Sequence, residues 1–175
     1  MKINLNLTAD IDKLRTLEAG TEVFLSGKIL AARDSAHKRI RKITGRGEAF
    51  PVSLKNAVIY YMGPAPARDG YPIGSCGPTS SYRMDDYLED TLRLGVVATI
   101  GKGERDIKLN KVIKKYKAPY LITIGGAGAY LAECVVSSEL LLFEDLGAEA
   151  VRELIVKDFP VIVGIDYRGI SIFKK

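Results

Sequence analysis

Hydrophobic and polar residues follow two different periods along this chain, and each period predicts a different kind of element. Strict alternation over residues 2–7 predicts a strand, because alternate side chains of a strand lie on one face. Runs of β-branched and other apolar residues predict strands elsewhere. The predicted strands cover residues 2–7, 21–32, 56–62, 96–100, 119–124, 135–143, 161–165 and 170–173.

Helices are predicted where apolar residues recur at every third or fourth position, or where a residue suited to a helix start precedes them. Met84, Leu88 and Leu92 form an apolar stripe at helical spacing. Pro78 suits the first turn of that helix, where a missing N–H costs nothing, and Gly95 should end it. The other predicted helices run from Asp10 through Leu17, from Ser35, between residues 103 and 119, and after Gly126.

One long segment, GPAPARDGYPIGSCGP at residues 63–78, is so rich in glycine and proline that only a loop is plausible. Elsewhere strands and helices alternate, without a linker or an internal repeat. This order predicts one mixed α/β domain that covers residues 1–175.

Composition narrows the class of protein and its compartment. The chain has 175 residues, 47% of them hydrophobic, which suits one globular domain with a sizeable core. Cys76 and Cys134 lack the spacing of a secreted disulfide framework, which favours a reducing compartment. The first residues do not form a signal peptide, and the longest apolar stretch, residues 121–136, contains three glycines and Glu133. We therefore expect a soluble, cytoplasmic protein with no membrane partner.

The formal charge of +5 favours anionic partners: a nucleic acid, an acidic subunit or a small polyanionic substrate. A platform for single-stranded nucleic acid would require aromatic residues among the basic ones, and few accompany the densest basic cluster. We interpret this cluster as a solvated helix face or a subunit contact, and we expect no nucleic-acid partner. Its members are Lys38, Arg39, Arg41, Lys42 and Arg46.

A candidate anion site lies at the predicted helix start that follows the glycine- and proline-rich loop. Thr79 and Ser80 would occupy the first turn, where backbone N–H groups lack partners and the helix dipole favours an anion. Arg83 follows by four and three residues, which would place its guanidinium on the same helix face. The plainer alternative is that the hydroxyls of this segment only cap the helix.

Lys102 stands between two glycines at the end of a predicted strand, where a flexible backbone can present an ammonium group to a cleft. The surrounding residues do not have the spacing of a phosphate-binding loop, and residues 124–130 do not fit a dinucleotide fingerprint. We therefore expect no nucleotide.

Metal-ligating residues are few. His37 is the only histidine, so the chain cannot build a site from two imidazoles, and a structural role is favoured over that of a catalytic base. Two cysteines cannot supply the usual thiolates of an iron–sulfur cluster, which leaves Cys76 a role in packing or loop structure. We expect no metal bound by this chain.

Three motifs in a fixed order resemble one protein family. They are ARDSAHKR at residues 32–39, GPTSSYRMD at residues 77–85 and IGKG at residues 100–103. This pattern resembles the C-terminal domain, or separate beta subunit, of class I fumarate hydratases (fumarases) and L(+)-tartrate dehydratases. The resemblance extends from about residue 23 to residue 173.

The resemblance implies a swivelling β/β/α domain that closes over a [4Fe-4S] cluster held by cysteines of an alpha subunit. It also implies a hetero-oligomer that acts on a C4-dicarboxylate, with this chain inert alone. In the family, the positions that face the substrate correspond to Arg33, Thr79, Ser80, Arg83 and Lys102, with catalytic roles for Thr79, as the base, and Lys102. The family most often has two threonines where this chain has Thr79 and Ser80.

The chemistry of the implied reaction suits these residue types. Removing a proton next to a carboxylate places further negative charge on that group, so Arg33, Arg83 and Lys102 would stabilise the transition state more than the ground state. Arginine grips a carboxylate through two parallel hydrogen bonds. The hydroxyl of Thr79 would need a lowered pKa, which a helix start and neighbouring cations could supply.

Several functions stay open at this point. The favoured one is a beta subunit for the reversible hydration of fumarate to L-malate, ahead of L(+)-tartrate dehydration. A non-catalytic domain that binds an organic anion in the same cationic cleft is the alternative from another class. Nucleic-acid binding through the cluster of residues 38–46 ranks below both.

Overall fold

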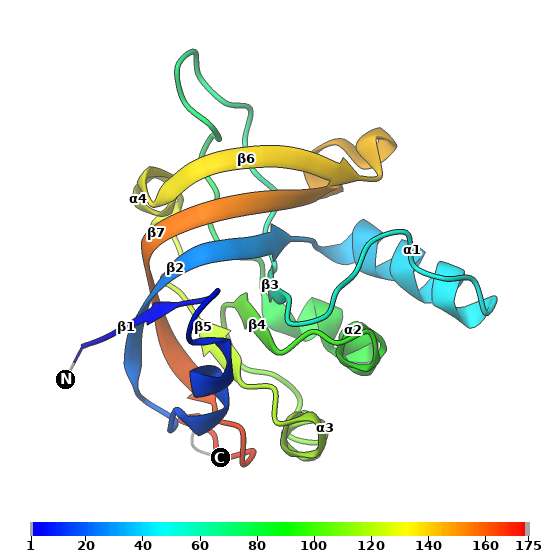
Figure 1. The fold of residues 1–175 in the computed structure, drawn as a ribbon, viewed down its shortest axis with the longest axis vertical. Coiled ribbons are helices and arrows are strands. Elements are labelled where there is room, and N and C mark those ends of the chain that lie inside the picture. Colours follow the sequence, from blue (N-terminus) through cyan, green and yellow to red (C-terminus); the bar gives the residue numbers. More distant parts are fainter. Residues whose placement is uncertain (1, 174–175) are drawn as a thin grey trace.

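The computed structural model describes residues 2–173, and they form a single mixed α/β domain around one seven-stranded sheet (Figure 1). The strands are β1 (Ile3–Asn6), β2 (Glu22–Ala31), β3 (Val58–Tyr60), β4 (Ala98–Gly101), β5 (Tyr120–Ile122), β6 (Val135–Leu142) and β7 (Val151–Ile165). The α-helices are α1 (Asp34–Gly45), α2 (Leu88–Arg93), α3 (Leu109–Tyr116) and α4 (Gly128–Glu133), and the 3₁₀ helices are η1 (Ile11–Thr16), η2 (Ser81–Tyr87) and η3 (Glu144–Glu149).

The sheet combines a parallel part with an antiparallel part and closes on itself. Strands β2, β3, β4 and β5 pair in parallel, in that order, and β1 runs parallel to the first half of β2. The long strand β7 pairs antiparallel with β5 on one side and with β2 on the other, and it also carries β6. Because β2 pairs with both β3 and β7, these strands form a closed ring.

Two apolar clusters fill the two faces of the ring. On β3, Val58 and Tyr60 belong to one cluster and Ile59 to the other, as alternate residues of a strand must. The first cluster lies among the strands themselves, and the second contains Met84, Leu88 and Leu92 of the segment η2–α2. Because both faces of β3 are buried, its residues form a continuous apolar run in the sequence.

The helices connect the parallel strands and cover one side of the sheet. Figure 1 shows α1, α2 and α3 together on one side, α4 beside the start of β6, and the segment 63–78 projecting past β6 as a loop. None of the helices in residues 2–173 is long and apolar enough to cross a membrane.

Most of the predicted elements are confirmed, and the corrections have physical reasons. Residues 170–173 form no strand, since Ser171 contributes only an isolated bridge to Ile165. The strand expected over 161–165 begins ten residues earlier, at Val151. The first half of β7 is interrupted by charged residues, and Asp158 adopts a left-handed φ of 52°, so its pattern does not alternate cleanly. The helices expected after Asp10 and Pro78 begin as 3₁₀ helices.

Candidate active site

The candidate site lies where the chain leaves the carboxyl ends of the parallel strands. Arg33 follows β2 by two residues and Lys102 follows β4 directly, while residues 61–63 follow β3. Strands that run in parallel end at the same edge of the sheet, so these segments meet although they are far apart in sequence. The segment 79–81, which leads into η2 at Ser81, joins the edge by hydrogen bonds to the residues after β3 and β4.

Two arginines of the candidate site share one carboxylate. Asp34, the first residue of α1, accepts from Nε of Arg33 at 3.1 Å and from Nε of Arg83 at 2.8 Å. Burial alone would raise the pKa of Asp34, but its own backbone N–H and the two guanidinium groups hold that pKa below its ordinary value. Arg33 and Arg83, 50 positions apart in the chain, are therefore held side by side by a charged carboxylate.

Glu149 of η3 completes this part of the site from a distant segment. One carboxylate oxygen lies 3.3 Å from Nε of Arg33. The other accepts the backbone N–H of Ser35 at 2.8 Å, so Glu149 also caps the first turn of α1. This part of the site thus contains two guanidinium groups and two carboxylates, whose formal charges balance.

The remaining candidate residues are joined through the backbone. The N–H of Thr79 donates to the carbonyl of Tyr61 at 2.7 Å. Ser80 and Lys102 form an isolated parallel bridge, and the N–H of Ser81 donates to the carbonyl of Lys102 at 2.9 Å. Thr79, Ser80 and Lys102 consequently lie next to one another at this edge of the sheet.

Glycines make the close approach of these segments possible. A Cβ atom on Gly101 would lie 1.9 Å from Oγ of Ser81, so the bridge to β4 requires a bare backbone there. A Cβ atom on Gly63 would lie 3.0 Å from Cδ of Arg33. Arg33 therefore rests against the glycine that follows β3.

The expected helix start is wrong in its details. The helix begins at Ser81, as a 3₁₀ helix, and Ser80 is its N-cap residue without a side-chain capping bond. Thr79 and Ser80 precede the helix, so Arg83 does not share a helix face with them and turns to Asp34 instead. The N–H groups of Thr79 and Ser81 are already donated to carbonyls, and neither is free to bind an anion. Side chains, rather than a helix terminus, must supply any anion site here.

Comparison with known proteins identifies the family. The family model described as "Fumarase C-terminus" matches residues 1–175. The chain belongs to this fumarase C-terminus family. It is 37% identical to fumarate hydratase 2 of Leishmania major over 99% of this chain, and 33% identical to the aerobic class I fumarate hydratase of Escherichia coli over 100% of it. It spans about a third of those relatives, 32% and 33% of their lengths.

A shorter relative has almost the size of this chain. The putative L(+)-tartrate dehydratase subunit beta of Methanocaldococcus jannaschii is 38% identical over 93% of this chain and 86% of its own length. This chain is therefore similar both to about a third of longer proteins and to most of a protein of nearly its own size.

The family resemblance implied a [4Fe-4S] cluster, and the thiols of this chain do not fit one. Cluster ligation requires thiolates. Burial, with a contribution from Cys134, raises the pKa of the Cys76 thiol to about 12, and burial also raises the pKa of Cys134. Among residues 2–173, no group of three or more His, Cys, Asp and Glu residues could hold a metal ion.

His37 has a structural place beside the site. Its side chain is 1% exposed, its Nδ1 lies 2.9 Å from the carbonyl of Arg33, and its ring packs edge-on against Tyr61 at 5.3 Å between centroids. Burial lowers its pKa to about 4, so the imidazole is neutral near pH 7. This geometry supports the sequence-based preference for a structural role over that of a base.

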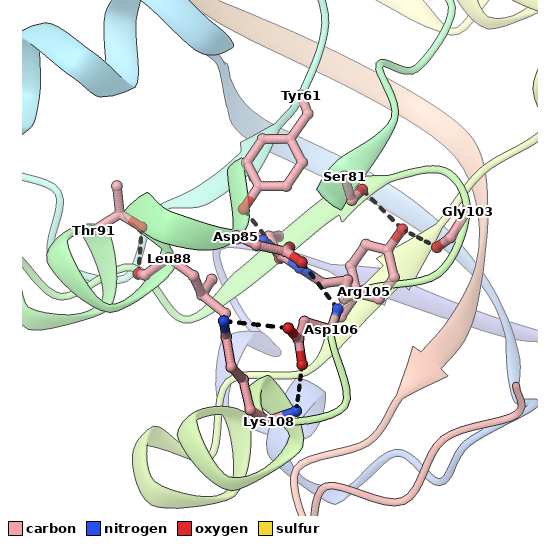
Figure 2. Close-up of polar contacts among 11 residues, drawn as sticks. Tyr61, Ser81, Asp85, Leu88, Thr91, Gly103, Arg105, Asp106 and Lys108 are labelled. Carbon is pink, nitrogen blue, oxygen red and sulfur yellow. Dashed lines mark hydrogen bonds and ion pairs between the residues drawn. The ribbon is translucent and has the colours of Figure 1, made fainter. Parts of the chain in front are cut away.

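Sequence reasoning missed a buried polar cluster behind the site. Arg105 is fully buried and its Nε donates to Asp85 at 2.8 Å, while its Nη1 donates to the hydroxyls of Tyr61 and Thr99 (Figure 2). Asp85 belongs to the GPTSSYRMD motif, but nothing in the sequence pairs it with an arginine 20 residues later. Glu149 was missed for the same reason, because its partners lie more than 110 residues away.

Proposed function

We propose that this chain is the beta subunit of a two-subunit, iron–sulfur-dependent hydro-lyase that reversibly hydrates fumarate to L-malate. Two observations support the proposal: Arg33 and Arg83 share the carboxylate of Asp34, and the backbones of Thr79, Ser80 and Lys102 are joined at the carboxyl ends of the same parallel strands. To bind a small diacid, a site needs guanidinium groups, an ammonium group and hydroxyls within a few ångströms of one another.

The lengths of the relatives support a subunit with a larger partner. The chain corresponds to about a third of the fumarate hydratases and to most of a protein named as a beta subunit. We propose that an alpha subunit supplies the remainder, forms a hetero-oligomer with this chain and holds the [4Fe-4S] cluster, whose iron would act as a Lewis acid toward the departing hydroxide. The two free cysteines suit a cytoplasmic location.

The charges of the site suit a dianion at the moment of proton removal. Asp34 holds the two guanidinium groups in place, so they need little reorganisation when a substrate carboxylate gains negative charge. Lys102 adds a further positive charge, and within residues 2–173 it forms no ion pair with a carboxylate. In this proposal Arg83 orients one carboxylate, while Lys102 stabilises the charge that develops beside the reacting carbon.

Thr79 is the proposed base. The residue is 8% exposed, and its backbone is fixed by the bond to the carbonyl of Tyr61. Because the helix begins only at Ser81, nearby cations rather than a helix terminus must favour the alkoxide. Each pKa unit of lowering requires about 1.4 kcal/mol of preferential stabilisation of the charged form.

L(+)-tartrate is the second candidate substrate, and one observation favours it. The relative named as a tartrate dehydratase subunit has a chain of similar length, whereas the fumarate hydratases are about three times longer. Tartrate carries one more hydroxyl than malate. The site residues of this chain suit the carboxylates of both substrates.

The test is to co-express this chain with its partner under anaerobic conditions and to assay fumarate, L-malate and L(+)-tartrate. Thr79→Ala should lower kcat about 10²- to 10⁴-fold, the usual contribution of a positioned general base, while the complex still assembles. Thr123→Ala is the matched control, because Thr123 is also 8% exposed but donates to the carbonyl of Pro160 on β7.

Near-normal turnover in Thr79→Ala would remove Thr79 as the base. If the wild-type chain bound malate by calorimetry and the assembled complex turned over none of the three acids, the chain would be an organic-anion-binding domain instead.

A further inference from the structure

Arg105 has an environment that a structural role in the core does not require. Its guanidinium is fully buried, although burying a charge is costly unless its partners are held in place. Burial alone would lower the pKa of Arg105, but Tyr61 and Asp85 hold that pKa above its ordinary value. The guanidinium also lies 5.3 Å and 5.2 Å from the ring centroids of Tyr61 and Tyr120. The chain therefore keeps a permanent cation here, between two aromatic rings.

The contacts of Arg105 reach both segments that carry the candidate cations. Asp85, its ion-pair partner, lies in η2 two residues after Arg83. Arg105 itself lies three residues after Lys102. The second oxygen of Asp85 accepts the backbone N–H of Asp106 at 2.9 Å, which ties the same two segments together once more (Figure 2).

A tyrosine hydroxyl makes a second link in parallel with the ion pair. The hydroxyl of Tyr120 lies 2.8 Å from Oγ of Ser81 and 2.8 Å from the carbonyl of Gly103. Ser81 in turn donates its N–H to the carbonyl of Lys102. In Figure 2 the side chains of Arg105 and Asp85 point toward each other beneath this link, from the loop after β4 and from η2.

We propose that Arg105 is a positioning residue, which through Asp85 and Tyr61 sets the distance between the segment of Thr79 and Arg83 and the loop of Lys102. This inference rests on the proposed function for its catalytic consequence, but its structural consequence can be measured without turnover. A displacement of about 1 Å between reacting groups can cost about 10²-fold in rate. Tyr61 belongs to the same device, because its hydroxyl accepts from Arg105 while its carbonyl accepts from Thr79.

The test compares Arg105→Lys, Arg105→Met and Tyr61→Phe in the assembled complex, with two readouts. The first is amide hydrogen exchange at Thr79 and Ser81, whose N–H groups bond to Tyr61 and Lys102. The second is kcat and KM for the diacid substrate. Lysine keeps the charge but cannot bond to Asp85, Tyr61 and Thr99 at once as the guanidinium fork does.

We expect exchange at Ser81 to accelerate at least about tenfold in Arg105→Lys and more in Arg105→Met, with kcat falling about 10- to 100-fold. Tyr61→Phe keeps Arg105 and Asp85 paired, so it should fold and show a smaller change in the same direction. Arg168→Lys is the control, since Arg168 also pairs with a buried aspartate, Asp166, at 2.9 Å. Its exchange at Ser81 and its kcat should match wild type.

Unchanged exchange at Ser81 in both Arg105→Lys and Tyr61→Phe would overturn the positioning role, whatever the kinetics show. If Arg105 variants do not fold, Tyr61→Phe decides alone. If exchange accelerates as expected but Thr79→Ala turns over normally, the positioning role stands and the assignment of the base fails.

Discussion

The parallel and antiparallel halves of the sheet differ in how their charged side chains are grouped and buried. At the carboxyl edge of β2 to β4, Asp34 joins two arginines and Glu149 adds a second carboxylate, in a partly buried cluster. In the antiparallel half, Lys28 on β2 pairs with Glu153 on β7, and the side chain of Lys28 is 61% exposed. Parallel strands end together and can gather side chains from several loops, whereas antiparallel neighbours end at opposite edges.

Among the effects on catalysis that test this comparison, the largest is expected at the two arginines that share Asp34. Arg83→Lys keeps the charge but loses the planar fork, so we expect kcat/KM of the assembled complex to fall about 10²-fold, or about 2.7 kcal/mol. Steady-state kinetics with the preferred diacid would measure it. Arg41→Lys is the matched control, because Arg41 pairs with Asp90 at 2.6 Å between α1 and α2, outside the site. Wild-type kinetics in Arg83→Lys would show that the cluster only holds the fold.

The second effect concerns pH and the buried histidine beside the cluster. In the unfolded chain His37 takes up a proton near pH 6.5, but in the folded chain only near pH 4. The unfolded state therefore binds more protons between these values, so the free energy of unfolding is highest above pH 6.5 and falls by about 3 kcal/mol as the pH drops to 4. Urea unfolding across this range would measure the loss.

The variant His37→Phe isolates that cause, because His37 is the only histidine of the chain. Its free energy of unfolding should change much less between pH 6.5 and pH 4.5 than that of wild type. An equal fall in both proteins would show that His37 is not its cause, since carboxylates such as Asp34, whose pKa is lowered, lose their contribution only at still lower pH.

The smallest effect belongs to the antiparallel half. Lys28→Gln removes the exposed pair with Glu153, and the free energy of unfolding should change by less than about 0.5 kcal/mol. Chemical denaturation at low and at high salt would measure it. A loss above about 1 kcal/mol would mean that the two halves of the sheet do not differ in the way described.

The sequence predicts those parts of the fold that depend on local periodicity. The apolar stripe of Met84, Leu88 and Leu92 and the run of β-branched and other apolar residues in β2 depend on neighbours a few residues away, and both predicted elements are confirmed. The first half of β7 was not predicted, because charged residues and the left-handed backbone at Asp158 interrupt its alternation. Pairing with β2 and β6 stabilises the strand there. Long-range pairing thus overrides the local pattern.

The same distinction between local sequence pattern and long-range contacts applies to the candidate site. The motifs indicated which cations and hydroxyls to examine, and parallel strand order explains why they meet. The carboxylates that hold them could not be predicted, because Glu149 reaches Ser35 and Arg33 from more than 110 positions away. The predicted helix start was wrong for a similar reason. Backbone hydrogen bonds to the carbonyls of Tyr61 and Lys102 keep the segment extended, so the first helical turn begins at Ser81.

The ring formed by β2, β3, β4, β5 and β7 has a mechanical consequence. Every seam of that ring is closed by main-chain hydrogen bonds, so no part of it can hinge away from the rest without breaking a ladder. The ring should therefore travel as one stiff piece, and Arg33, Arg83 and Lys102, which lie outside its strands, keep their places through the side-chain and backbone bonds to neighbouring segments. Under the proposed function, any closure over a substrate would then take place between this piece and the proposed alpha subunit.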